Sequence, residues 1–211
     1  MRMRMLVLLL IAAVVAAGAQ EKKTAKDMKP AKGMKADKHP SMNAPQSEQM
    51  QKLEKILAGT WSLDEQFEPM EGMPGGKGKG TEVVKRGPGG NSLVSDLKST
   101  SAMGSFTGHG LMWYDAKAGG YRSIWCDTMT AKGCEDSGIG KWQGDKLVFE
   151  FDSEMPPEMG GGSIHMVETF SDVTPKSFTF AMDGTMNGHN MHMMTIKYKK
   201  VGGMSATATK K

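Results

Sequence analysis

Short segments of alternating apolar and polar residues, separated by glycine-rich turns, repeat along most of this sequence. Side chains of a strand alternate between the two faces of a sheet, so each segment predicts a strand with one buried face. No helical periodicity occurs between them, which favours an antiparallel sandwich or a closed up-and-down barrel over a parallel α/β fold. About ten strands are predicted, near residues 61–67, 81–86, 93–98, 106–114, 121–127, 135–142, 146–152, 164–170, 177–182 and 190–198.

The chain before these strands divides into three parts. Residues 1–19 have a basic start, an apolar stretch and small residues at positions 17–19, as a cleavable secretory signal does. The apolar stretch is shorter than the ~20 residues that cross a bilayer, so we expect no membrane span. Residues 20–48 are rich in Lys, Met and Pro and predict a disordered linker. Residues 49–57 carry apolar residues on one helical face and predict a short helix.

The predicted domain therefore covers residues 49–201, and residues 202–211 form a disordered tail. The net charge of +4 is modest, and much of the excess lies in the linker and the C-terminus. No strand carries a basic and aromatic stripe, so we expect no nucleic-acid partner. The glycine-rich segment 74–80 lacks the phosphate-loop pattern and predicts a flexible hairpin loop.

Cys126 and Cys134 are the two cysteines of the chain. Their close spacing in an exported protein predicts a disulfide bond. They lack the CxxC spacing of a redox-active pair. We therefore expect a structural bond. The secretory signal predicts a periplasmic or secreted location for the protein.

Several motifs resemble the bacterial family known as domain of unknown function 1579. They are LAGTW at residues 57–61, GLMWYD at 110–115, Tyr121 followed by WCD at 125–127, GKWQG at 140–144 and MTIKY at 194–198. The resemblance extends over about residues 53–199. It implies a calycin-like or lipocalin-like barrel, but it implies no reaction, because one fold supports many functions.

Strand alternation predicts which side chains face the interior. Leu147, Phe149 and Phe151 share one face, and Glu168 shares the inward face of its strand. The last strand would place His192, Met194, Ile196 and Tyr198 inside. The candidate ligand-binding residues are Trp61, Trp125, Glu168, His192 and Tyr198.

Two further kinds of chemistry stay open from the residues alone. The segment after residue 182 is rich in Met and His, which suit copper, and its candidate ligands are Met186, His189, His192 and Met194. An inward His192 would also suit the axial ligand of haem. Carboxylates such as Glu65, Glu150 and Glu168 are candidate groups for acid–base catalysis, although no known catalytic motif is present.

We predict from these observations an exported, non-enzymatic protein that binds a small apolar ligand inside the barrel, because a barrel of more than eight strands tends to enclose a volume. No cofactor is predicted. Copper or haem binding, an enzyme of unknown reaction and a structural domain are the alternatives.

Overall fold

The computed structural model describes residues 44–70, 74–130, 132–155, 157 and 161–201. The expected signal peptide (residues 1–19), the first part of the expected linker and the expected tail (residues 202–211) lie outside the described residues. The end of the linker segment, from residue 44, contacts the domain: the Asn91 side-chain amide donates to the carbonyl oxygens of Ala44 and Pro45.

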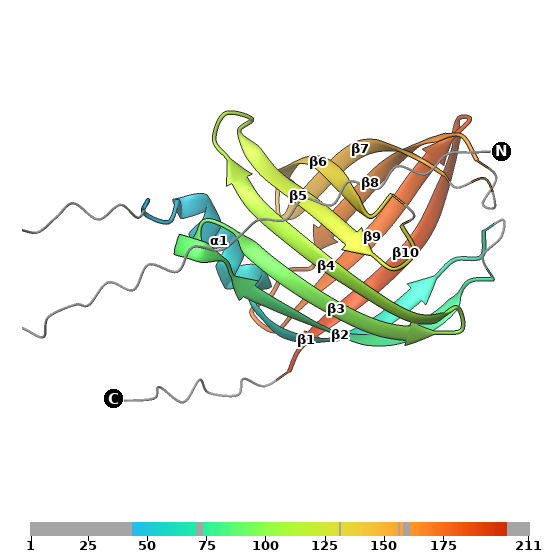
Figure 1. Ribbon diagram of the computed structural model, residues 1–211, viewed down its shortest axis with the longest axis horizontal. Helices are drawn as coiled ribbons and strands as arrows, with labels where there is room; N and C mark the ends of the chain where they lie inside the picture. The colour runs from blue at the N-terminus through green and yellow to red at the C-terminus, as the bar shows by residue number, and fades with distance from the viewer. Residues whose placement is uncertain (1–43, 71–73, 131, 156, 158–160, 202–211) are drawn as a thin grey trace, which may run out of the picture. The chain divides into compact units, whose positions relative to one another are not determined.

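One short helix, α1 (Glu48–Leu57), precedes the sheet. The hydroxyl of Ser47 accepts from the backbone N–H of Met50 and so caps the first turn. Met50, Leu53 and Leu57 form its buried face. The helix lies at one end of the barrel (Figure 1), which we call the α1 end.

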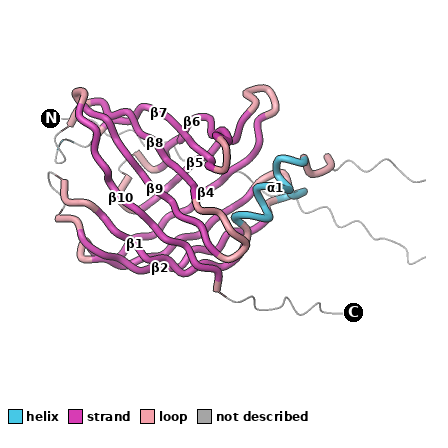
Figure 2. Tube along the Cα trace, turned by 180° about the vertical axis from the view of Figure 1, so that it is seen from behind, coloured by secondary structure: helices cyan, strands magenta, loops and turns pink. Residues whose placement is uncertain are grey.

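Ten strands form a closed, entirely antiparallel barrel in which neighbours along the chain pair, and β1 closes the ring against β10. The ring is also seen from behind in Figure 2. The prediction of an up-and-down barrel with one short helix is confirmed. The strands are β1 (Gly59–Phe67), β2 (Gly76–Arg86), β3 (Leu93–Ser101), β4 (Gly104–Asp115), β5 (Gly120–Asp127), β6 (Cys134–Gln143), β7 (Lys146–Glu154), β8 (Ser163–Ser171), β9 (Ser177–Met186) and β10 (His189–Lys200).

Apart from Val148, the buried apolar side chains of the described residues form two separate clusters. The first packs α1 against the barrel wall and includes Trp61 and Phe149, both 0% exposed. The second is built on Ile164, Met166 and Met193, at the end of the barrel away from α1, which we call the methionine end. Methionines make up most of the partly buried side chains around it: Met70, Met155, Met182, Met186 and Met191, with Phe151.

The glycine-rich segment is mostly strand, so the prediction of a loop at residues 74–80 is wrong from Gly76 onward. Gly78 lies opposite Glu65 of β1, and a methyl group at Gly78 would collide with the Glu65 carboxyl group. The glycine therefore leaves space for an inward side chain of the neighbouring strand. A run of glycines is expected in a flexible loop, and also in a strand that must leave room for a large side chain of its neighbour. The sequence does not distinguish the two.

Strand β10 contains a register shift between His192 and Met194. The extra residue lets Met193 and Met194 both pack inward, Met193 in the second cluster and Met194 against the first. The side chains before the shift therefore point to the opposite face from the one they would occupy in a regular strand.

Within the described part of the chain, α1 is too short for a bilayer crossing.

Candidate functional site

Glu82 and Tyr198 form a polar pair inside the barrel near the α1 end. Glu82 pairs across the sheet with buried Trp61 and buried Leu97, so its side chain faces inward. The hydroxyls of Tyr198 and Ser95 donate to the Glu82 carboxylate. Burial raises the pKa of Glu82 despite these hydrogen bonds, and burial, with the Glu82 charge, raises the pKa of Tyr198 well above its usual value.

Glu65 lies further inside, on the inward face of β1. It is 5% exposed, and its Oε2 is buried without a hydrogen-bond partner among the described residues. Burial raises the pKa of Glu65, while the hydroxyl of Ser99 opposes the rise. A buried carboxylate oxygen without a donor is costly, because desolvation is not compensated. Glu65 therefore provides an acceptor that the barrel itself leaves unused.

Glu168 points inward from β8, where it pairs with Phe149 and Met182. The side chain keeps accessible surface although it points into the barrel. Burial raises its pKa to about 7; the hydroxyl of Ser137 opposes the rise and the nearby Glu135 carboxylate adds to it. Arg122, on β5, pairs with Asp115 at 2.8 Å and not with Glu168.

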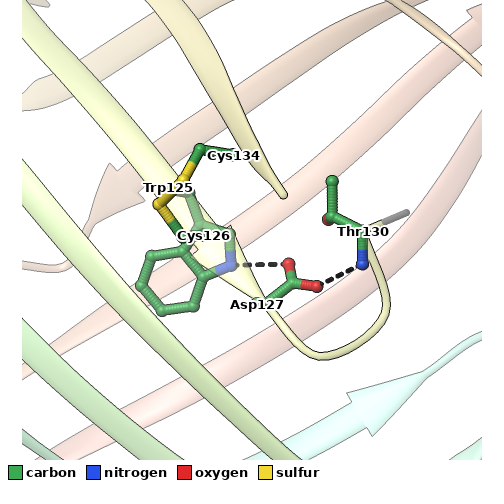
Figure 3. The surroundings of a disulfide bond; sticks show 5 residues. All are labelled: Trp125, Cys126, Asp127, Thr130 and Cys134. Atoms are coloured by element: carbon green, nitrogen blue, oxygen red, sulfur yellow. Dashed lines mark hydrogen bonds between the residues drawn. A yellow bond between two sulfur atoms is a disulfide. The ribbon is translucent and has the colours of Figure 1, made fainter. Parts of the chain in front are cut away.

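Trp125 forms part of the inner wall on β5. Its ring lies against Gly108 and Gly110 of β4, and a methyl group at Gly108 would collide with it. It stacks on Phe106, with 6.5 Å between ring centroids, and its indole N–H donates to Asp127 at 2.8 Å (Figure 3). Both aromatic residues keep accessible surface. They provide an apolar part of the inner wall.

Cys126 and Cys134 are directly opposed on β5 and β6 and form the predicted disulfide. The bond closes the connection that leaves β5 after Trp125 (Figure 3). Within that connection, the Asp127 carboxylate accepts the backbone N–H groups of Met129 and Thr130. The disulfide thus holds the strand that carries Trp125.

His192 lies outside the barrel, so the prediction that it faces inward is wrong. The register shift turns it outward, where its ring contacts Asp183 at 2.7 Å and Thr195 at 2.8 Å. It lines an outer depression of about 410 Å³. Each of the four described histidines is exposed, so the described interior offers no imidazole as a haem ligand.

The four candidate copper ligands do not converge. Met194 packs inside the barrel and His192 lies outside it, on opposite faces of one strand. Met186 borders the second cluster, and His189, its cross-strand partner, is exposed. Among the described residues, no group of three His, Cys, Asp or Glu side chains is arranged to hold a metal ion.

Four of the five residues predicted to bind ligand, Trp61, Trp125, Glu168 and Tyr198, face the interior of the barrel, where Trp61 and Tyr198 are buried in the first cluster. Sequence reasoning missed Glu82. Glu82 lies two residues before Val84 and therefore on the same face of β2, so the strand alternation indicated that its carboxylate points inward. Glu150, the other carboxylate considered, is exposed on the outer face of β7.

Comparisons with known proteins place the chain in a family. A search of curated proteins found no match. Among solved structures, Rv2717c from M. tuberculosis is 10% identical with a TM-score of 0.49, and the match covers 74% of this chain and 99% of that one. A redesigned β-barrel, mFAP0, bound to DFHBI, is 15% identical with a TM-score of 0.36, covering 68% of this chain and 98% of that one. The profile of the family described as "Protein of unknown function (DUF1579)" matches residues 45–200, and this chain therefore belongs to that family.

Proposed function

We propose that this protein binds a small, largely apolar molecule inside its barrel and catalyses no reaction on it. The observation that carries the proposal is the side chain of Glu168, which points into the barrel and nevertheless keeps accessible surface. A group in that position borders an internal space.

The division of the core supports the same conclusion. The buried apolar side chains form two clusters, one at each end of the barrel. Inward aromatic side chains that pack against the first cluster, such as Trp125, Phe106 and Phe180, remain only partly buried. Ligand sites are concave and mainly apolar, with few polar groups that fix orientation, and this interior has that composition.

The test uses N-phenyl-1-naphthylamine, an uncharged fluorescent probe at neutral pH. We expect saturable binding to the native protein, with energy transfer from tryptophan. Met194→Trp should fill the interior and weaken binding at least about tenfold, because the added ring competes for the same volume. Lys197→Trp, on the outward face of the same strand, is the matched control and should bind like the native protein.

Circular dichroism would establish that both variants fold. Absence of saturable binding by the native protein would refute the proposal. Equal probe affinity in the folded Met194→Trp and Lys197→Trp proteins would show that the probe binds elsewhere, and would also refute it.

A second candidate function, binding of a soft metal ion such as Cu(I), is favoured by where the methionines lie. Each of the five connections at the methionine end carries or adjoins a methionine, while the four at the other end, residues 87–92, 116–119, 144–145 and 172–176, contain none. The five described methionines at these connections are Met70, Met103, Met129, Met155 and Met186. If methionine were simply abundant along the whole chain, it would occur in the connections at both ends of the barrel.

Thioethers are soft ligands that select Cu(I), but methionine also fills irregular apolar space. Leucine separates the two roles, because it keeps most of the volume and removes the sulfur. If the methionine end binds metal, the double variant Met155→Leu, Met186→Leu should compete with bicinchoninate for Cu(I) less well than the native protein does. Met112→Leu, in the first cluster, should leave it unchanged. Failure of the native protein to compete would exclude this candidate.

A further inference from the structure

The barrel interior carries acidic groups on several strands. Glu65 of β1, Glu82 of β2 and Glu168 of β8 all point inward. Burial raises the pKa of Tyr198 on β10, and the negative charges of all three carboxylates raise it further. Glu65 and Glu82 come from one hairpin, whereas Glu168 and Tyr198 come from late strands that reach β1 because the sheet closes through β10.

The described part of the chain offers no cation to balance them. Every lysine in it is exposed. Its two arginines are engaged elsewhere: Arg86 pairs with Glu54 at 2.7 Å and Arg122 with Asp115 at 2.8 Å. The partners of the inward glutamates are hydroxyl groups, which donate hydrogen bonds without supplying charge. A buried negative charge is normally paired, so this interior lacks a positive partner.

The Glu65 side chain adds an observation that points to a ligand. It is buried, its Oε2 has no donor among the described residues, and it lies over Gly78, which leaves room for it. The described carboxylates do not form a metal-ion group. The acceptor therefore suits an N–H donor on an organic molecule, and a protonated amine would supply both the missing donor and the missing charge.

Resting on the proposed function of ligand binding, we propose that the ligand is a cationic amphiphile: an apolar body with a protonated amine that donates to Glu65 and is balanced by Glu168 and Glu82. The apolar body packs against Trp125 and Phe106. Inward methionines, such as Met182 beside the second cluster and Met194 beside the first, are flexible enough to fit bodies of different shape.

The raised pKa values of these glutamates give the proposal a second readout. Burial holds a proton on Glu168 in part of the molecules near neutral pH, since its pKa is about 7. An ammonium group beside the carboxylates favours their ionised form. Amine binding should therefore release protons, whereas binding of an uncharged analogue should not.

The experiment compares three molecules of one shape by isothermal titration calorimetry at pH 7: 2-naphthylmethylamine, 2-naphthylmethanol and 2-naphthoate. We expect the amine to bind at least about tenfold more tightly than the alcohol, and the carboxylate least tightly, because like charges repel. Repeating the amine titration in buffers of different ionisation enthalpy measures the proton release.

Glu65→Gln keeps the shape of the side chain and removes its charge. It should weaken amine binding at least about tenfold and change alcohol binding less than about twofold. Glu150→Gln, on the outer face of β7, is the matched control and should change neither. Glu168→Gln should act like Glu65→Gln and also reduce the proton release, so the result does not depend on one variant.

The outcomes separate the two proposals. If neither amine nor alcohol binds, ligand binding in the interior is refuted, and this inference fails with it. If both bind equally, or if the folded Glu65→Gln and Glu168→Gln proteins retain full preference for the amine, the interior still binds ligand, but the requirement for a cation is refuted.

Discussion

The two ends of the barrel are packed in different ways. At the α1 end, Trp61, Phe149 and Leu53 are fully buried, and Trp61 meets Phe178 edge-on at 4.8 Å between centroids. At the methionine end, three side chains are buried, and most of their neighbours are partly exposed methionines. Rings and branched side chains have few rotamers, whereas methionine has many. We infer that the α1 end provides stability and the methionine end provides adaptability.

The largest test of this contrast is truncation at each end. Trp61→Ala should lower the free energy of unfolding by about 3–5 kcal/mol, because it leaves a cavity among fully buried neighbours. Met191→Ala, where the side chain is partly exposed, should cost about 1 kcal/mol or less. Urea melts of the two variants measure both values. Equal losses would show that both ends stabilise the fold alike.

A smaller effect concerns the interior between the ends. Glu168 has a folded-state pKa of about 7 and an ordinary value of 4.5, so the folded state holds the proton more tightly. Its ionisation therefore opposes folding: stability should fall as the pH rises from about 4.5 to 7, by up to about 3 kcal/mol, and stay lower above that range.

Glu168→Gln should remove that part of the pH dependence, so that the variant gains on the native protein as the pH rises. Melts at pH 5, 6, 7 and 8 give the comparison. Glu150→Gln, on the exposed face, is the control and should follow the native curve. A Glu168→Gln curve parallel to the native one would mean that the carboxyl group is not desolvated in the folded protein.

The smallest effect tests how the methionine end is held. Replacing Cys126 and Cys134 by serine should lower stability by about 2 kcal/mol, because the disulfide closes a short loop there and restricts the unfolded chain. Melts of oxidised and reduced native protein provide the control. Identical melts would show that the bond contributes nothing to that end.

Prediction from sequence succeeded where the strand pleat is regular. Leu147 and Phe149 were placed correctly in the core because no irregularity interrupts β7. Glu168 was placed inward correctly because β8 pairs with β7 without a register shift. His192 was misplaced because a single extra residue in β10 reverses every side chain before it. Nothing in a run of Met and His marks where such a residue falls.

The sequence by itself determined the class of fold: short alternating segments joined by tight turns pair with their neighbours, and two cysteines at facing ends of one connection bond across it. Tertiary structure alone decided that the negative charges of Glu65, Glu82 and Glu168 all act on the Tyr198 hydroxyl. Alternation is a local property of the backbone, so a sequence reveals which face a side chain occupies. Which side chains meet across the interior depends on the closure and stagger of the whole ring, and no local pattern specifies these.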